Sequence, residues 1–371
     1  MKVSAHEKRI LEWFDYFHAH PETSWKEIGT TNRIAAILDE LQVAYRRLPD
    51  SPGLIAEIGE GQRAVAVRAD IDALWQEVDG IWKANHSCGH DAHIAMVLGA
   101  LLYVLDSKID HKIRFIFQPA EEKGNGSLEM IKHGAMEDVT HFFGVHVRPA
   151  EEMELGQFSP AIRHGAAIFL EGKIRGEDAH GARPHQGKNG INVIMAIHQF
   201  LKDIYFSPWD VYSAKLTKIQ AGGESLNIIP GTVEFAIDIR AQKNDILEKM
   251  KECISAGLNS IAQLHNCPIE FEWKDYTPGA VVSPKARAIA EEAIIKTLGK
   301  EKVADDVQTS GSDDFHFYTI EHPEVSATMI GVGAAVKPGL HHPQMTFERS
   351  ILDQGARVLA AALLMAKPFK E

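Results

Sequence analysis

The chain has 371 residues, of which 45% are hydrophobic and 24% charged, a composition typical of a globular protein with a large core. Its 39 basic and 51 acidic side chains give a formal net charge of −12, and no basic segment offsets this charge, which argues against a nucleic-acid partner. The three cysteines are too few for a disulfide framework, and the N-terminus lacks the apolar segment of a signal peptide. The longest apolar run, residues 95–105, is too short to span a membrane. We therefore expect a soluble cytoplasmic protein.

The first 150 residues alternate between helical and strand patterns. Apolar side chains at 10, 11, 14 and 17 recur at helical spacing, and the segment Ser24-Trp-Lys-Glu27 has the capping-box pattern that begins a second helix. Apolar segments at 63–70, 112–118 and 141–147 are typical of buried strands, and helical stretches at 91–105 and 127–133 lie between them. This alternation predicts an α/β fold, with a mostly parallel sheet covered by helices and a ligand crevice at the carboxyl ends of its strands.

A different order of elements begins at about residue 165. The patterns predict strands at 166–175, 215–220, 231–240 and 268–273, with one helix over 191–204 and another over 246–261. This strand-helix-strand-strand-helix-strand order is the split βαβ, ferredoxin-like arrangement of an α+β domain. The α/β pattern returns after about residue 284, with a strand at 325–331 and a final helix. We therefore expect one domain built from residues 1–164 and 281–371, interrupted by an inserted domain over 165–280.

The strongest chemical signal is the segment His86-Ser-Cys-Gly-His-Asp-Ala-His93, which precedes an apolar helix. Cys88 and His90 are ligands suited to zinc or a similar first-row metal ion, although side chains hydrogen-bonded within a loop are the plain alternative. Glu121 and Glu122 follow the strand at 112–118. One carboxylate of such a pair can bind a metal ion while the other takes a proton from water, and a solvated acidic turn is the alternative.

Two further histidine signals are weak when each is taken alone. His146 ends the strand that begins at 141, and a buried histidine of this kind is more often hydrogen-bonded than a ligand. His341-His342 lies in the loop after the strand at 325–331. Together with the clusters above, these residues supply Cys, Glu and His side chains from four strand ends, and this convergence predicts a metal centre.

These motifs resemble those of the zinc-type amidohydrolases and peptidases that include aminoacylases, hippurate hydrolases and indoleacetyl-amino acid hydrolases. The resemblance covers essentially the whole chain, and the cysteine cluster followed by the paired glutamates is its most specific part. The motifs that carry it are His20-Pro-Glu22 with Ser24 and Glu27, residues 68–74, 86–93, 118–122 and 180–185, Gly222-Gly223 with Asn227 and Pro230, and residues 340–343.

The resemblance implies a site that holds two divalent metal ions, which could be zinc, manganese, nickel or cobalt. It implies that the inserted domain is a lid that also forms a homodimer. The implied metal ligands are Cys88 as the bridge, His90, Glu122, His146 and His341. Glu121 matches the general base, and Asp70 and Asp72 match an acidic pair that orients the ligands.

Three residues of the inserted segment match positions that contact substrate in this family. His180 matches a histidine of the lid that polarises the scissile carbonyl, often from across the dimer. Asn227 and Arg240 match positions that bind the substrate's carboxylate, with a plain surface charge as the alternative for Arg240. The chain departs from the family pattern at Trp75, usually proline, at Asn189-Gly190, usually Asp-Pro, and in the loop at 123–126. These departures surround the expected pocket, so they bear on the substrate more than on the chemistry.

The predicted function is metal-dependent hydrolysis of the amide bond in N-acyl amino acids or related small amide conjugates by a metal-activated water. A dipeptidase and an amidohydrolase of ureido compounds are the alternatives within enzymes. A catalytically inactive relative that binds a metal or senses a ligand is the alternative of a different class, and the complete ligand set together with Glu121 argues against it. The expected partner is a small amide substrate, with no nucleic-acid or membrane partner.

Overall fold

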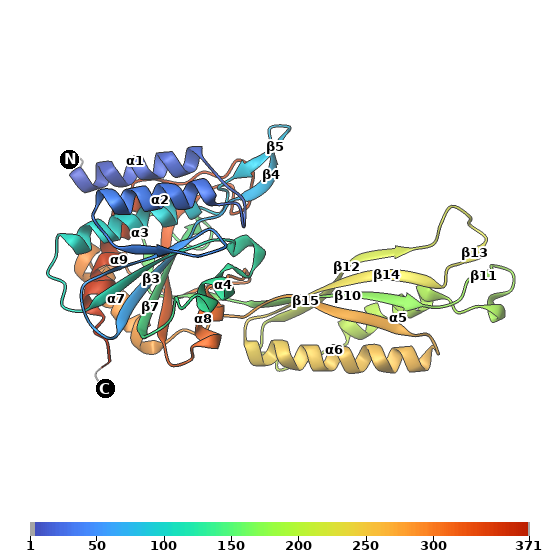
Figure 1. Ribbon diagram of the computed structural model, residues 1–371. Helices are drawn as coiled ribbons and strands as arrows, with labels where there is room; N and C mark the ends of the chain where they lie inside the picture. Colours follow the sequence, from blue (N-terminus) through green and yellow to red (C-terminus); the bar gives the residue numbers. More distant parts are fainter. Residues whose placement is uncertain (1–3, 370–371) are drawn as a thin grey trace. The chain divides into compact units, whose positions relative to one another are not determined.

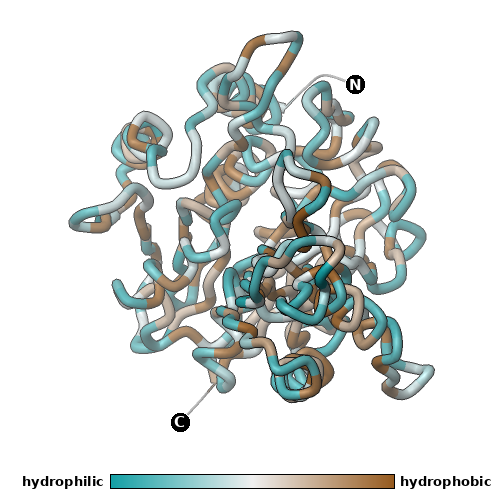
Figure 2. Tube along the Cα trace, turned by 90° about the vertical axis from the view of Figure 1, so that its right-hand side faces the viewer, coloured by the Kyte–Doolittle hydropathy of each residue, from teal (hydrophilic) through white to brown (hydrophobic). Residues whose placement is uncertain are grey.

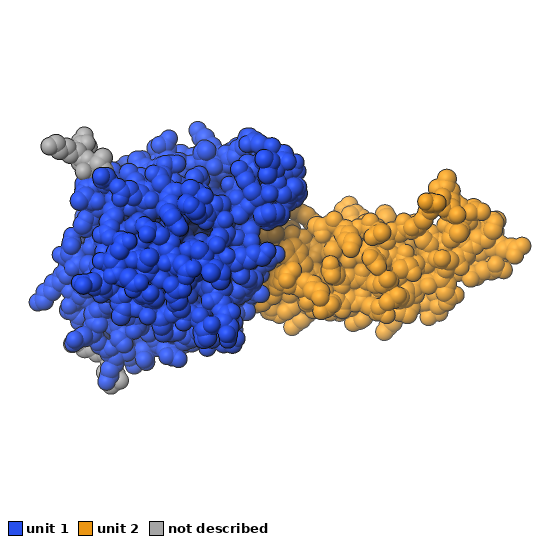
Figure 3. All heavy atoms as spheres, turned by 45° about the horizontal axis from the view of Figure 1, so that its top comes forward, with its two compact units in different colours: residues 1–163, 281–308, 314–371 blue, residues 164–280, 309–313 orange. Residues whose placement is uncertain are grey.

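The computed structural model describes residues 4–369 and divides the chain into two compact units, which Figure 3 shows in different colours. Unit 1 comprises the chain up to residue 163, residues 281–308 and the chain from residue 314 on, and unit 2 comprises residues 164–280 and 309–313. The short stretch 309–313 lies outside the predicted 165–280 segment. It groups with unit 2 because the Gly165 N–H donates to the carbonyls of Thr309 and Gly311. The metal-binding and lid roles of the two units stay predictions.

Unit 1 is built on a seven-stranded sheet in the order β1-β2-β6-β3-β7-β17-β8. The four central strands run parallel and the outer three are antiparallel to their neighbours. The strands are β1 (Tyr45–Arg47), β2 (Leu54–Ile58), β6 (Lys112–Gln118), β3 (Ala64–Asp70), β7 (Val139–Pro149), β17 (Ser326–Val336) and β8 (Phe158–Ser159). Every residue of β3 and β7 is buried, as expected for parallel strands covered on both faces. This confirms the predicted α/β fold with a mostly parallel central sheet.

Helices cover both faces of this sheet. Val65 and Val67 point into a core formed with α1, α2, α3, α7 and α9, while the alternate residues Ala64 and Ala66 point into a second core that includes residues of α4 and α8. The helices are α1 (Ala5–Ala19), α2 (Ile28–Glu40), α3 (His90–Leu105), α4 (Gly126–Lys132), α7 (Pro284–Leu298), α8 (His316–Glu321) and α9 (Ile351–Met365). No helix among residues 4–369 is long and apolar enough to cross a membrane.

Shorter elements complete this part of the chain. A hairpin joins β4 (Leu74–Val78) to β5 (Ile81–Asn85), and β9 (Ile162–His164) pairs with β16 (Val307–Thr309). Single 3-10 turns occupy η1 (Glu121–Lys123) and η3 (Lys300–Lys302). The turn η1 matters most for function, because it follows the central strand β6 and carries both acidic side chains of the Glu121-Glu122 pair.

The start of the second helix differs from the prediction. The capping-box pattern placed it at Ser24, but α2 begins at Ile28 and Ser24 makes no cap. Instead the Glu22 carboxylate accepts the N–H groups of Gly29, at 3.0 Å, and Thr30, at 2.7 Å. An acidic side chain from outside the pattern thus satisfies the helix N-terminus, and the Ser24 hydroxyl donates to a residue 48 positions away in the sequence.

Unit 2 is a four-stranded antiparallel sheet in the order β12-β14-β10-β15, with two helices packed on it. Its chain order is β10 (Ala166–Arg175), α5 (Gly190–Lys202), β12 (Tyr212–Ala221), β14 (Thr232–Ala241), α6 (Asn244–Leu264) and β15 (Ile269–Thr277). This order confirms the predicted ferredoxin-like arrangement. Figure 1 shows α5 and α6 on the same side of the sheet, and a single apolar core lies between.

The hydropathy pattern explains why one face of unit 2 is covered. Along β14, buried and half-buried residues alternate after the exposed Thr232, and α6 buries one stripe of residues from Ile246 to Ile261. Figure 2 colours the trace by hydropathy and shows that hydrophilic and hydrophobic residues are interspersed along it. Beyond the Arg175 end of β10, the short strands β11 (Ala179–His180) and β13 (Ile228–Ile229) pair with each other, and a 3-10 turn η2 (Pro184–Gln186) follows β11.

Candidate metal centre

Six side chains with ligand or acid–base chemistry come together in unit 1. They are carried by the start of α3, by the turn η1 after β6, by β7, and by the loop after β17. Three of these places lie at or beyond the carboxyl ends of parallel strands, where an open α/β sheet collects its functional side chains. The six residues are Cys88, His90, Glu121, Glu122, His146 and His341.

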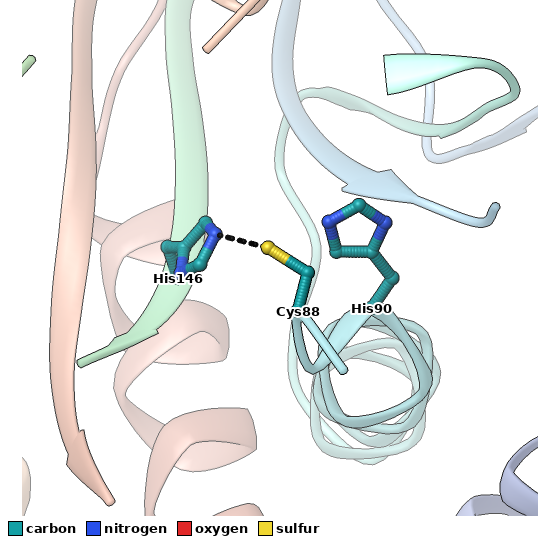
Figure 4. Close-up of side chains that lie close together, drawn as sticks. All are labelled: Cys88, His90 and His146. Carbon is teal, nitrogen blue, oxygen red and sulfur yellow. Dashed lines mark hydrogen bonds between the residues drawn. The ribbon is translucent and has the colours of Figure 1, made fainter. Parts of the chain in front are cut away.

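Cys88 occupies the middle of this group. Its Sγ atom lies 3.6 Å from His146 Nε2 and 3.2 Å from His341 Nε2. Figure 4 shows the thiol between the rings of His146 and His90. The ligand atoms of Cys88, His90 and His146 all lie within 4.8 Å of one another, and so do those of Cys88, Glu122 and His341. Two donor groups therefore share one thiol, which is the arrangement that a bridging thiolate between two metal ions requires.

Hydrogen bonds fix the tautomers of two of the histidines. His146 Nδ1 lies 2.7 Å from the Val147 carbonyl, and His90 Nδ1 lies 2.9 Å from the Asp72 carbonyl. A carbonyl can only accept, so each Nδ1 carries the proton and donates it. When neutral, such a ring presents a lone pair at Nε2, the atom that lies 3.6 Å from Cys88 Sγ in the case of His146. This is the usual way in which proteins prepare a histidine for a metal ion.

Two buried polar atoms of the cluster indicate that these residues fit a metal ion. Neither His90 Nε2 nor Glu122 Oε1 has a hydrogen-bond partner among the residues that the structure describes. Glu122 Oε1 does form an ion pair with the His341 side chain, whose Nε2 lies 3.3 Å away. Buried polar groups are costly to leave unsatisfied, and a thiol, imidazoles and carboxylates form a donor set that suits a first-row divalent ion.

The charges in the cluster shift the protonation of its histidines in opposite directions. The contact with Cys88, followed by the ion pair with Glu122, raises the pKa of His341 to about 10. Burial lowers the pKa of His146 well below its usual value. A proton on His341 thus balances neighbouring acidic groups in the metal-free protein, and a bound cation can replace that proton, because metal binding to such ligands releases protons.

Of the two aspartates predicted to orient the ligands, Asp72 is hydrogen-bonded to two of them, whereas Asp70 is hydrogen-bonded to His93. The Asp72 carboxylate accepts the Glu122 N–H at 3.0 Å and the Ser24 hydroxyl at 2.7 Å, and its Oδ1 lies 3.2 Å from His90 Nδ1. Asp70 Oδ1 instead accepts from His93 Nδ1 at 2.6 Å, and the Val147 N–H donates to the other nitrogen of that ring. Both nitrogens of His93 are therefore engaged, which leaves His93 no lone pair for a metal ion.

The predicted substrate residues of unit 2 lie at opposite ends of its sheet. His180 and Asn227 are neighbours, since His180 pairs with Ile228 and the Asn227 carbonyl accepts the Gly181 N–H at 2.7 Å. Arg240 lies near the other end of β14, eight residues beyond Thr232, which is about 26 Å along an extended strand. Its guanidinium is bonded to Asp238 and to the Ser310 carbonyl beside a surface pocket. The structure does not bring Asn227 and Arg240 together within one chain.

Comparison with known proteins establishes the family. A model of peptidase family M20/M25/M40 matches residues 66–365. The chain belongs to this family. N-acetylcysteine deacetylase of Bacillus subtilis is 28% identical to it, over 97% of each chain. IAA-amino acid hydrolase ILR1-like 6 of Arabidopsis thaliana is 30% identical, over 93% of this chain and 77% of its own length.

A solved structure supports the same assignment. The YXEP protein of Bacillus subtilis, a dinuclear metal-binding peptidase of family M20, matches this chain with a TM-score of 0.83 and 25% identity, over 97% of this chain and 98% of that one. The resemblance drawn from the sequence motifs is therefore confirmed. As a member of family M20/M25/M40, the chain is a metal-dependent hydrolase that acts on amide or peptide bonds.

Sequence reasoning missed part of what supports the centre of this M20 hydrolase. Arg68 is fully buried and donates to Gln118 and Asp314, and Gln118 donates to Asp314 in turn. An arginine inside an apolar strand was the available signal for this network. Asp314 carries no such signal in the sequence, because its partners Arg68 and Gln118 lie 246 and 196 residues away. Ser24 was assigned to a helix cap, and its contact with Asp72 could not be seen from the pattern.

Proposed function

We propose that this M20 hydrolase cleaves the amide bond of N-acyl amino acids or related small amide conjugates, using two divalent metal ions held by Cys88, His90, Glu122, His146 and His341. The observation that carries the proposal is the shared position of Cys88 in two donor groups, with the Glu121 carboxylate beside them. The names of two relatives, an N-acetylcysteine deacetylase and an IAA-amino acid hydrolase, support this substrate class. A cytoplasmic location stays a prediction.

The chemistry of the site divides between the ions and the chain. Zinc, manganese, nickel and cobalt all suit a Cys, His and Glu donor set, so the metal has to be identified by experiment. Divalent ions in such a site lower the pKa of water and stabilise the negative charge that develops on the carbonyl oxygen. The residues of the chain place the ions, move the proton and hold the substrate.

Glu121 and Glu122 take different roles because they face different partners. Glu122 Oε1 lies 3.3 Å from His341 Nε2 and belongs to the donor group of Cys88, which favours a ligand. Glu121 is absent from the group of Cys88 and His341. Both glutamates lie near His90 Nε2, with Glu121 Oε2 at 3.8 Å and Glu122 Oε1 at 3.9 Å, so the contact with the shared thiol is what sets Glu122 apart. Glu121 is therefore the general base: it takes a proton from the water that attacks the amide carbon and delivers that proton to the leaving amine as the C–N bond breaks.

His180 has the hydrogen bonding of a donor to an oxyanion. The Ala182 N–H donates to His180 Nδ1 at 3.0 Å, so the proton of the neutral ring lies on Nε2. The side chain is exposed, and Nε2–H is available to a substrate carbonyl. In the proposed mechanism His180 stabilises the developing oxyanion through this N–H, a contribution that grows as charge accumulates in the transition state.

The separation of Asn227 from Arg240 supports a homodimer formed through unit 2. A small substrate has one carboxylate, and two groups about 26 Å or more apart on one sheet cannot both bind it. Two copies of the chain could supply one residue each. We propose that the substrate carboxylate meets Arg240 of one copy and Asn227 of the other, while His180 beside that Asn227 reaches the scissile carbonyl. Light scattering on the purified protein tests the dimer, and a monomer with full activity would contradict it.

A matched substrate screen tests the proposed reaction. N-acetyl, N-benzoyl and indoleacetyl derivatives of several amino acids should be compared with dipeptides and N-carbamoyl amino acids, each with Zn²⁺, Mn²⁺, Ni²⁺ or Co²⁺. We expect the highest kcat/KM with an acyl amino acid. A preference for dipeptides would make the chain a peptidase, and a protein that holds two metal ions but cleaves none of these substrates would refute the proposal.

A further inference from the structure

Glu27 is a buried acidic residue that the mechanism above does not use. Its side chain is fully buried, and Oε1 accepts the Ala120 N–H at 2.8 Å across 93 residues of sequence. It forms no cap for its own helix, which Glu22 caps instead. The side-chain hydrogen bond of Glu27 is therefore directed at the turn that leads into Glu121, rather than at α2.

That turn is strained at Ala120. Ala120 has a φ of 52° and a ψ of 41°, the left-handed conformation that a residue with a Cβ atom adopts only at a cost. Its carbonyl accepts the Gly126 N–H at 3.3 Å, while its N–H is held by Glu27. Strained residues of this kind persist only where their surroundings hold them. A change of φ at Ala120 would redirect everything that follows, and the next residue is Glu121.

The same N-terminal segment also supports the second glutamate. The Ser24 hydroxyl donates to the Asp72 carboxylate, and that carboxylate accepts the Glu122 N–H. Residues 24–27 thus act on both ends of the Glu121-Glu122 pair. Glu27 accepts the Ala120 N–H directly, and Ser24 reaches the Glu122 N–H through the Asp72 carboxylate. Ser24 acts on the proposed ligand, and Glu27 acts on the residue before the proposed base.

We propose that Glu27 is a positioning residue whose carboxyl oxygen holds Ala120 in its left-handed conformation and thereby aims Glu121 at the substrate. This inference rests on the proposed role of Glu121 as general base. Glu27 needs only an acceptor for this task. Burial, followed by the charge of Asp72, raises the pKa of its carboxyl to about 8, so the neutral acid prevails below that pH and glutamine reproduces its shape and its acceptor.

The test compares an acceptor-keeping variant with an acceptor-lacking one. Glu27→Gln should keep kcat within about twofold, whereas Glu27→Met, of similar volume, should lower kcat about tenfold or more with KM and metal content unchanged. Glu22→Met is the matched control: it removes a neighbouring carboxylate that only caps α2, so it should lower the Tm and leave kcat as it is. Ala120→Gly in the Glu27→Met background should raise kcat again by several-fold, since glycine takes the left-handed conformation without strain.

The outcomes separate this inference from the proposed function. Wild-type kcat in Glu27→Met, equal losses in Glu27→Gln and Glu27→Met, or loss of metal in Glu27→Met would each overturn the positioning role. If Glu27→Met does not fold, the double variant with Ala120→Gly carries the test, and a folded double variant with low kcat contradicts the inference. Glu121→Gln is measured in parallel: a normal rate there refutes the base itself, whereas a slow Glu121→Gln beside a normal Glu27→Met refutes only the role of Glu27.

Discussion

Replacing Asp72 with alanine tests whether one buried carboxylate holds the proposed ligands from behind. The side chain is fully buried and accepts from the Ser24 hydroxyl, the Glu122 N–H and His90 Nδ1. His90 Nδ1 keeps a second acceptor, the Asp72 carbonyl at 2.9 Å, which the substitution leaves in place. The variant therefore loses two hydrogen bonds outright and weakens a third.

These contacts set the size of the expected effect. A hydrogen bond to a charged group contributes about 1.5–3 kcal/mol, and the lower end applies here because alanine also removes the cost of burying a charge. The two lost bonds then lower the free energy of unfolding of the metal-free protein by about 3 kcal/mol. Metal affinity should fall by about 10–100-fold, the usual scale for residues that orient ligands, because both Glu122 and His90 lose a constraint.

The two quantities can be measured separately. Urea unfolding of the metal-free protein gives the stability, and competition with a chelator of known affinity gives the metal binding. Ser24→Ala is the control, since it removes one of the two bonds and leaves the contacts of Asp72 with Glu122 and His90 in place. It should show about half of the stability loss and a much smaller loss of metal affinity than Asp72→Ala. A folded Asp72→Ala variant that binds metal as tightly as the wild type would refute the orienting role of this carboxylate.

Three further predictions follow from the same geometry. Glu121→Gln should keep its metal ions and lose kcat by about 10²–10⁴-fold, while Glu122→Gln should lose metal affinity and recover part of its rate in excess metal; the reverse pattern in metal analysis would exchange the two roles. Cys88→Ser should bind fewer than two metal ions and lose turnover, so an active variant with full metal content by mass spectrometry would contradict the shared thiolate. Burial, followed by the charges of Lys285 and His111, lowers the pKa of His141 from 6.5 to about 4. As the pH falls, the unfolded chain therefore takes up a proton on His141 before the folded chain does, and the free energy of unfolding decreases between about pH 6.5 and pH 4. His141→Phe should flatten that part of the unfolding free energy measured against pH, and an unchanged slope would show that another group is responsible.

The strands that form the centre of each sheet were predictable because their side-chain pattern records their surroundings. The predicted segments 112–118 and 166–175 coincide with β6 and β10. The strand β6 lies between two others and is covered on both faces, and its centre, Phe115-Ile-Phe117, is an uninterrupted apolar segment. Two short or exposed strands were not identified, although the edge strands β12 and β15 of the four-stranded sheet were predicted. The strand β1 has three residues and β5 is largely exposed, so neither carries an apolar pattern that distinguishes it from a loop.

The residues of the candidate site likewise fall into those that the sequence could predict and those that it could not. Cys88 and His90 were identified because both stand in one short segment with the chemistry of a ligand pair. The order of elements also placed Glu121 and Glu122 at a strand end next to them. The supporting contacts have no such signal, because the hydrogen bonds of Arg68 to Asp314 and of Glu27 to Ala120 join segments far apart in the chain. Their residue types have many surface explanations until the fold brings the partners together.

The N-terminal helices and the segment between them support the proposed metal centre of this hydrolase. They precede residues 66–365, the part that the family model matches, and none of the proposed metal ligands lies in them. Yet α1 packs its apolar face against α3, the helix that begins at His90, and the segment before α2 reaches Asp72 and Ala120. A metal centre of this kind needs ligands held in place before the ions arrive, because each loosely held donor must be ordered when they bind. The segment from Ser24 to Glu27 supplies that order to the glutamate pair, although it contains none of the proposed ligands.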